Sequence, residues 1–310
     1  MDLGLFQQFG KASITPASSK YWGYVLVLAD AMTGKVRQAF LDAVALVVDV
    51  VDWREFEKAM ADGQRSKALE VLNLERNLNL ALKGGFASAL VQVLLAAGTQ
   101  SAKQAVMRVP TRMAAVASFD VTNPATLQFL ENYRAGLITN VSKETATAVA
   151  DVVRNSVVDG TGPRATARTV KTLVGLLPKQ AAQVQKYREQ LTNEGRPQVQ
   201  IDRMVERLAK RKLNERADMI ARTETLRASN AGNQLSWKQL QADGLLPPDQ
   251  RHQWVVTPDD RLCPDCAAIP GMNKQGRAVG EPFESPLGPV TFPPLHPHCR
   301  CTTVLMVTPA

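Results

Sequence analysis

Two short stretches determine the fold of the C-terminal region: Cys263-Pro264-Asp265-Cys266 and His296-Pro297-His298-Cys299-Arg300-Cys301. Together they hold all four cysteines of the 310-residue chain. Paired thiol and imidazole ligands a few residues apart are typical of a structural zinc site, because a tetrahedral metal takes its ligands in such pairs. Pro264 and Pro297 restrict the backbone of the two ligand turns, which lowers the entropy lost on binding. The sequence therefore predicts a structural Zn²⁺ that closes the loop between the two stretches.

Three ligands follow from this pattern and a fourth has two candidates. The three are Cys263, Cys266 and Cys299, and the fourth is either Cys301 or His296. If the chain from Cys299 onward is a strand, Cys299 and Cys301 point to the same face, which favours four thiolates. If His296 lies in a turn, its spacing from Cys299 repeats that of the first pair. Both alternatives stay open at this point.

The competing interpretation of the four cysteines is a pair of disulfides. We disfavour it because the chain begins Met1-Asp2-Leu3-Gly4, without the basic and apolar segment of a secretory signal, so that a reducing compartment is expected. The remaining histidines, His252 and His298, are expected at the surface or just outside the ligand shell, because four ligands close a structural zinc site.

Further motifs accompany the cysteines in a fixed order: Ile220-Ala221-Arg222-Thr223-Glu224 followed by Asn230, then Thr257-Pro258-Asp259-Asp260-Arg261-Leu262-Cys263, then Pro294-Leu295-His296-Pro297 running into Cys299-Arg300-Cys301. In order and spacing, they resemble the phage Mu F-like family of minor head (head morphogenesis) proteins. The similarity is clearest from about Asp120 to Val307, and Phe119-Asp120-Val121-Thr122-Asn123-Pro124 resembles the customary entry to that domain. Residues 1–118 carry no assignable motif.

The resemblance implies a low-copy structural virion protein near the portal vertex, involved in capsid assembly and in handling packaged DNA, without enzymatic activity. The implied partners are the portal protein, the major capsid or scaffolding protein, packaged DNA through non-specific contacts, and further copies in a ring around the portal. The expected location is the capsid interior or portal vertex, with host cytoplasm during assembly. No stable membrane insertion is expected, because the longest apolar run, Phe86 to Gly98, is shorter than the ~20 residues that span a bilayer.

The competing function is a metal-dependent, treble-clef-like nuclease acting on phage DNA. His296-Pro297-His298 beside thiolate ligands prompts this interpretation. Such an enzyme needs a second site with its own histidines and polar ligands. The chain has three histidines and no His/Asn set after Cys301, so this machinery is missing from the sequence.

Positive charge is concentrated between Arg164 and Arg216, where 13 Lys/Arg face 5 Asp/Glu, an excess of 8 that equals the chain's formal net charge of +8. The cations that share one face of a helix here are Arg203, Arg207, Lys210 and Arg211, with Lys212 and Arg216 nearby. They form either a solvated helix face or a binding surface for DNA phosphates or an acidic partner such as a portal. Tyr187 is the one aromatic residue of the segment, so base stacking is not predicted.

The fold class is predicted as mainly α, with helical N-terminal and central regions and a small mixed α+β, zinc-stabilised C-terminal lobe. Aromatic residues make up 5% of the chain, and abundant alanine, leucine and valine favour packed helices. The expected regions are 1–118, an N-terminal helical region for portal or capsid docking, 119–245, a central helical domain, and 246–310, the zinc lobe. Two strands are expected in the lobe, at residues 253–257 and 301–307.

Glycine and proline set the expected helix ends. Breaks are expected at Gly63, Gly84-Gly85 and Gly98, and Asn123-Pro124 is expected to start a helix as cap and first residue. Later helices are expected to end at Gly160, before Pro178 and at Gly195. A long helix is expected from Ile201 to about Gln241.

Glu224 lies on the apolar line of that long helix, at i+11 from Leu213. A buried carboxylate needs a partner, and Arg227, Arg222 or backbone amides of the zinc lobe are the candidates. An exposed glutamate is the alternative if the helical register differs. The family resemblance adds that Thr223 and Glu224 pin the helix against the C-terminal lobe. No second acid, base or nucleophile lies beside Glu224 in sequence, so no catalytic residue is predicted.

Overall fold

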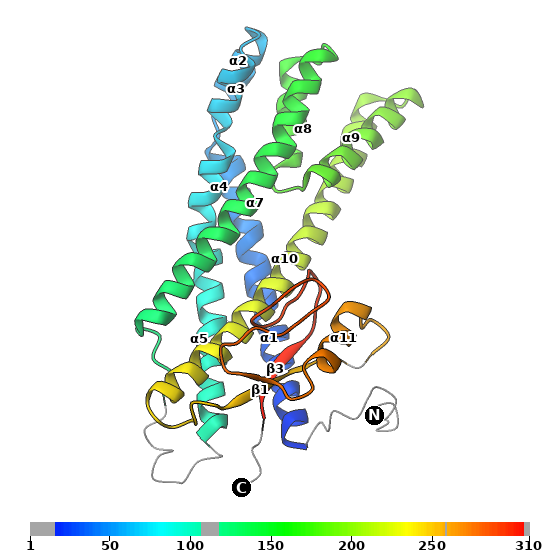
Figure 1. Ribbon diagram of the computed structural model, residues 1–310. Helices are drawn as coiled ribbons and strands as arrows, with labels where there is room; N and C mark the ends of the chain where they lie inside the picture. The colour runs from blue at the N-terminus through cyan, green and yellow to red at the C-terminus, as the bar shows by residue number, and fades with distance from the viewer. Residues whose placement is uncertain (1–15, 107–117, 258, 307–310) are drawn as a thin grey trace. The chain divides into compact units, whose positions relative to one another are not determined.

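The computed structural model of the protein describes residues 16–106, 118–257 and 259–306 (Figure 1). It is 70% helical, with a small three-stranded sheet near the C-terminus, so the predicted fold class is confirmed. The helices of the described residues are α1 (Pro16–Val50), α2 (Trp53–Ala61), α3 (Arg65–Leu72), α4 (Leu74–Lys83), α5 (Gly85–Val106), α7 (Pro124–Val158), α8 (Pro163–Leu173), α9 (Pro178–Asn193), α10 (Gln198–Ala242) and α11 (Pro264–Met272). The strands are β1 (Arg251–Val255), β2 (Arg277–Ala278) and β3 (Thr302–Leu305).

The chain divides into two compact units, each assembled from segments that are distant in sequence. Unit 1 comprises Met1–Val36, Ala89–Leu130 and Met219–Ala310, and unit 2 comprises Arg37–Ser88 and Glu131–Asp218. The three consecutive regions expected from the sequence do not coincide with these units, and as functional divisions they stay a prediction.

Most helix ends lie where glycine, proline and caps predict them. α7 begins at Pro124, and the Asn123 side chain accepts a hydrogen bond from the Ala125 amide at 3.0 Å, as a helix cap does. The 45-residue α10 runs three residues further at its start than expected and ends one residue later. Gly63, with φ +69°, follows α2, and Gly84 separates α4 from α5.

The expected break at Gly98 is wrong, because α5 continues through it to Val106. A Cβ atom at this position would lie 2.4 Å from the Phe119 ring. Glycine therefore makes room for an aromatic side chain from a later segment. A single glycine costs a helix only about 1 kcal/mol relative to alanine, which the contact can offset.

The expected strands are also shifted. β1 covers 251–255 rather than 253–257, because Thr257 leaves the ladder and donates its hydroxyl to the Arg300 carbonyl at 2.8 Å. β3 covers 302–305, inside the predicted 301–307, of which Val307 lies outside the described residues. The sheet order is β2-β1-β3 and both pairings are antiparallel, with His252 opposite Leu305 and Trp254 opposite Thr303.

In unit 2, α10 buries a positive charge. The Arg216 side chain is 1% exposed, and its guanidinium donates to the Gly175 carbonyl at 2.7 Å and to Glu144 at 2.7 Å. Burial lowers the pKa of Arg216, and Glu144 opposes that shift. Arg216 therefore ties α10 to α7 and to the turn after α8. The sequence-based placement of Arg216 near the exposed basic face is wrong for this reason.

In unit 1, α10 packs on α5 and on the sheet. A Cβ atom at Gly232 would lie 2.4 Å from the Leu94 carbonyl oxygen, so the two helix backbones touch at this crossing. On another part of α10, Trp237 and Leu240 share a hydrophobic cluster with Val255 of β1 and Val304 of β3. The long helix is thus the support on which the small sheet lies.

Among the described residues, no single helix combines the length and apolar character needed to cross a membrane. The segments Arg65–Lys83 and Gly85–Ala105 meet that requirement only when taken together, with a bend of 40° between them.

Replacing Gly232 by alanine should destabilise the protein by about 1–3 kcal/mol, because the added methyl group overpacks a backbone contact. The matched control is Gly136→Ala in α7, where nothing lies within 4 Å of the added atom, so stability should rise by up to about 1 kcal/mol. Urea unfolding of both variants measures the difference. Equal stabilities would contradict the close crossing of α5 and α10.

Candidate metal centre

The first ligand pair is formed by the start of α11. Pro264 is the first residue of the helix and Cys263 is its cap, with the Cys263 sulfur accepting the Cys266 amide at 3.3 Å. A proline at this position is compatible with a helix start because its missing N–H would have no partner there. This one-turn geometry brings the two sulfurs of the pair to the same side of the helix end.

The second ligand cluster lies between the turn at His296 and the start of β3 at Thr302. The donor atoms of Cys263, Cys266 and His296 lie within 4.8 Å of one another, and so do those of Cys266, Cys299 and Cys301. The structure therefore brings together the donor atoms of all five candidate ligands, with Cys266 shared by the two triads.

One sulfur–sulfur distance in the cluster matches a tetrahedral metal centre. His296 Nε2 lies 3.0 Å from the Cys263 sulfur and 3.2 Å from the Cys266 sulfur, and the Cys266 and Cys299 sulfurs are 3.7 Å apart. Two thiolates on one tetrahedral zinc are about 3.8 Å apart, given a Zn–S bond of about 2.3 Å. A disulfide bond would need about 2.05 Å. All four cysteines are free thiols in the structure.

The imidazole of His296 is oriented for metal binding. Its Nδ1 lies 2.8 Å from the Pro297 carbonyl oxygen, an acceptor that holds the proton on Nδ1. The lone pair of Nε2 then faces the sulfurs, which is the arrangement that supports most metal-bound histidines. Burial lowers the pKa of His296, but the hydrogen bonds to Pro297 and Cys263 outweigh it and the net shift is upward.

The choice between Cys301 and His296 as fourth ligand is not decided by these positions. His296 lies in a turn, as one alternative required. Cys299 and Cys301 precede β3 rather than lying in it, yet both sulfurs lie beside Cys266. Both candidates stay in the ligand set.

The sulfurs cannot all be ionised without a cation. Neighbouring thiols and burial raise the pKa of Cys266, whereas hydrogen bonds from Cys266 and Cys301 lower the pKa of Cys299. One thiolate is thus stabilised at the expense of its neighbours. A divalent cation would neutralise several thiolates together, and metal binding would release their protons. The cluster lines a cavity of about 20 Å³, enough for one ion.

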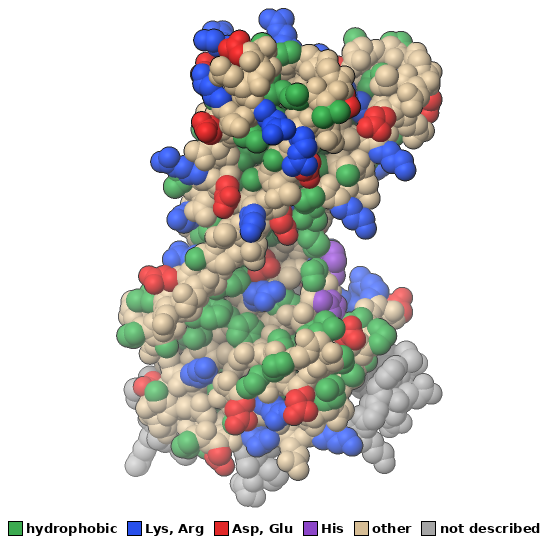
Figure 2. All heavy atoms as spheres, turned by 45° about the horizontal axis from the view of Figure 1, so that its top comes forward, with side chains coloured by type: hydrophobic (Ala, Val, Ile, Leu, Met, Phe, Trp, Pro, Cys, Tyr) green, Lys and Arg blue, Asp and Glu red, His purple; other side chains and the backbone are tan. Residues whose placement is uncertain are grey.

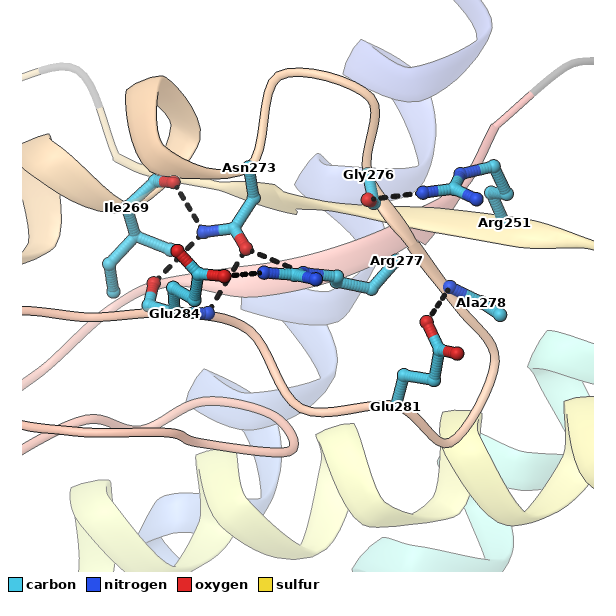
Figure 3. Close-up of polar contacts among 8 residues, drawn as sticks. All are labelled: Arg251, Ile269, Asn273, Gly276, Arg277, Ala278, Glu281 and Glu284. Carbon is cyan, nitrogen blue, oxygen red and sulfur yellow. Dashed lines mark hydrogen bonds and ion pairs between the residues drawn. The ribbon is translucent and has the colours of Figure 1, made fainter.

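The loop between the two ligand clusters is ordered by its own polar contacts (Figure 3). The Asn273 amide donates to the carbonyls of Ile269 and Glu284 at 2.8 and 2.9 Å and accepts from the Glu284 amide at 3.0 Å. Arg277 donates to Asn273 at 2.9 Å and pairs with Glu284 at 2.5 Å. Phe283 is fully buried. The loop therefore has polar contacts and a buried aromatic residue of its own.

An ion pair joins Asp259, in the segment that follows β1, to the second ligand cluster. The Arg300 guanidinium contacts both carboxylate oxygens of Asp259, a bidentate geometry that fixes direction as well as distance. The hydrogen bond from Arg300 lowers the pKa of Asp259 to about 2. Because Arg300 lies between two candidate ligands, this pair restrains the turn that carries them.

The family motif of residues 220–224 and Asn230, called the α10 motif below, lies against the ligand cluster. Thr223 accepts a hydrogen bond from the His298 amide at 3.3 Å, and Asn230 contacts Cys301 and the start of β3. Glu224 is 8% exposed and pairs with Arg227 at 3.2 Å, the first of the partners considered from the sequence. The sequence singled out Asn230 as part of the motif but gave no role for it.

The four predicted binding cations, Arg203, Arg207, Lys210 and Arg211, are all exposed on α10. Arg211 lies 3.9 Å from Glu215. A contact with phosphates or with an acidic protein requires exposed cations on one helix face, but a solvated face has them too. Exposure therefore does not distinguish the two interpretations.

His252 is not a surface residue, so the first of the two alternatives expected for it is wrong, whereas His298 is exposed. His252 is 0% exposed in β1, with Nδ1 2.8 Å from the Gln234 amide and its ring 4.7 Å from that of Phe283. Burial lowers the pKa of His252 to about 3. In the sequence, His252 stands two residues before Trp254 and so shares its face of the strand, but the predicted strand began at Gln253 and left His252 out.

Comparison with known proteins identifies the family. The family model described as Phage Mu protein F like protein matches residues 147–304, just over half of the chain. The chain belongs to this family. Membership implies a phage head morphogenesis protein. The match to the Mu F-like family includes the five candidate ligands, the α10 motif and the exposed cations. No curated protein and no solved structure matches the chain.

The buried neutral His252 predicts a pH-dependent loss of stability. Below pH 6.5 the imidazole of His252 is protonated in the unfolded chain, whereas in the folded chain it stays neutral down to about pH 3. The free energy of unfolding therefore decreases as the pH is lowered through this window. Between pH 6 and pH 4 the wild type should lose about 2.5 kcal/mol more than His252→Gln. His298→Gln removes an exposed imidazole and should behave as wild type. Urea unfolding at several pH values measures this, and parallel curves for wild type and His252→Gln would contradict the assignment.

Proposed function

We propose that the protein is a low-copy structural component of a phage head, located at the portal vertex, that acts by binding rather than by chemistry. The observation that carries the proposal is the family match over residues 147–304. The described fold is consistent with such a role, because long helices offer extended surfaces to partner proteins. The proposed partners are the portal protein, the capsid or scaffolding protein, and further copies in a ring.

We assign Zn²⁺ to the cluster around Cys266. Four thiols and one imidazole form a soft ligand set, which favours zinc over Mg²⁺ or Ca²⁺. Five candidate donors exceed the four that a tetrahedral ion accepts, so protein groups can fill the coordination shell. A closed shell makes the metal structural. It also speaks against the nuclease interpretation, which needs an open position for water or substrate.

The exposed cations of α10 are the proposed contact with packaged DNA. The side chains at 203, 207, 210 and 211 follow one helix face and can approach a run of phosphates. On the face that Figure 2 shows, Lys and Arg side chains are interspersed with Asp and Glu. Contacts of this kind read no sequence and weaken steeply with salt.

Protein purified without chelator should contain one zinc per chain, and Cys263→Ser should lower that content. The ligand turns should then become sensitive to protease while the helices of unit 2 stay folded, because the apolar packing there does not involve the metal. Elemental analysis and limited proteolysis measure both effects. His298→Gln is the control and should retain zinc. A metal-free preparation with its lobe still fully protected would contradict the proposal.

The location in the particle is tested on virions rather than by truncation. Deleting residues 1–118 would remove α1–α5 and with them buried residues such as Phe56 and Leu94, so failure of the truncated chain to enter heads would only report misfolding. An asymmetric reconstruction of the virion should instead show a few copies at one vertex. Copies spread over the shell, or none, would contradict the portal location.

Binding to DNA should be weak and independent of sequence. Replacing Arg203, Arg207, Lys210 and Arg211 by glutamine should flatten the dependence of log K on log salt by about 3–4 units, since each phosphate contact contributes about 0.9. The matched control replaces four exposed cations of unit 2 elsewhere: Arg54, Lys58, Arg65 and Arg76.

An unchanged salt slope in the α10 variant, or an equal change in the control, would mean that the α10 cations form a solvated face or a protein-binding surface instead. Incubation of the wild type with plasmid DNA and Mg²⁺ completes the experiment. Cleavage of the plasmid by the wild type, and its loss in His298→Gln, would favour the nuclease over the structural role.

A further inference from the structure

Asn230 of α10 is a buried amide whose hydrogen-bonding capacity is completely used. A side-chain amide offers two donor and two acceptor positions. The Asn230 nitrogen donates to the carbonyls of Leu226 at 3.0 Å and Cys301 at 3.4 Å, and its oxygen accepts from the Thr302 hydroxyl at 2.7 Å and the Thr303 amide at 3.2 Å. Three of these four bonds reach the segment that carries the candidate ligand Cys301.

Thr223 holds the other end of the same segment. It precedes Asn230 by seven residues, so both side chains lie on one face of α10. Its hydroxyl oxygen accepts the amide of His298, a residue with φ +63°. Between these two anchors, the Arg300 carbonyl accepts the Thr257 hydroxyl at 2.8 Å. The backbone around Cys299 and Cys301 is therefore fixed by protein groups on both sides.

The other ligand cluster is held differently. Cys263 and Cys266 are fixed by the local start of α11, where the Cys263 sulfur accepts the Cys266 amide, and their sulfurs lie beside His296 and Cys299. Within the described part of the chain, the hydrogen bonds to this face of α10 come from the Cys299–Cys301 side. The site therefore has two halves with different supports.

We infer that Thr223 and Asn230 are positioning residues that preform the Cys299–Cys301 half of the metal site on α10, so that the metal joins the Cys263–Cys266 half to a ligand turn already in place. This inference rests on the proposed metal site. Side chains that support a ligand from outside the coordination shell typically contribute 10–100-fold to metal affinity. The α10 motif thereby acquires a role without touching the metal.

The experiment measures Zn²⁺ affinity by competition with a chromophoric chelator on the full chain. Asn230→Ala should weaken binding by about 10–100-fold. Thr223→Val and Thr302→Val, which each remove one hydroxyl at nearly constant volume, should weaken it less and in the same direction. The control is Thr225→Val, because Thr225 is a fully buried residue of α10 whose hydroxyl has no hydrogen-bond partner among the described residues. It should leave the affinity unchanged.

A second readout does not need the metal. After chelation, hydrogen exchange at the Thr303 amide should remain slow in the wild type and become fast in Asn230→Ala. An exposed Thr303 amide in the metal-free wild type would overturn the inference, as would wild-type affinity in folded Thr223→Val and Thr302→Val. If Asn230→Ala does not fold, the two valine variants decide. If the wild type binds no zinc, the proposed metal site fails while the exchange measurement still tests the hydrogen bonds of Asn230.

Discussion

The polar side chains that α10 buries satisfy backbone groups of irregular segments, and the rest of the structure depends on this. Arg216 binds the carbonyl of Gly175 in the turn after α8, Asn230 binds the backbone of Cys301 and Thr303, and Gln239 binds both the amide and the carbonyl of Asp120. Buried backbone groups outside helices and sheets need such partners, since an unpaired one costs about 1–3 kcal/mol. One helix thus fixes three connections that have no regular structure of their own.

How much of the fold and of the candidate site could be predicted from the sequence depends on the range of the interactions. Features set by neighbouring residues were predicted correctly. Asn123-Pro124 gave the start of α7, and the spacing of cysteines and histidine gave the complete set of clustered donors. The errors at Gly98 and His252 have another cause, because each environment is supplied by a residue far away in the chain. Phe119 occupies the space beside Gly98, and Phe283 covers His252.

Arg216 shows the same limit for charge. A count of cations between residues 164 and 216 treats them alike, whereas the structure buries one and leaves others on the surface. Only the acceptors on α7 and in the turn after α8 distinguish them, and no local pattern encodes such partners. The roles of Thr223 and Asn230 could not be predicted for the same reason. In the sequence both are ordinary helix positions, and the backbone groups that they bind lie far away in the chain.

The C-terminal lobe therefore has three kinds of support: the face of α10, the polar contacts of the loop around Asn273, and the candidate metal. The loop's own contacts mean that the metal does not have to order the entire lobe. The proposed metal would join the start of α11 to the turn before β3. A lobe closed in this way would fit the structural role proposed for this member of a phage head family.

The central claim is a sulfur-rich zinc centre at Cys266, and X-ray absorption at the zinc edge tests it most directly. The account predicts a four-coordinate ion with three or four sulfur ligands at about 2.3 Å and at most one nitrogen. The same spectrum decides between Cys301 and His296 as the fourth ligand. A first shell of oxygen and nitrogen alone, or the lack of a zinc edge in protein purified without chelator, would contradict the account.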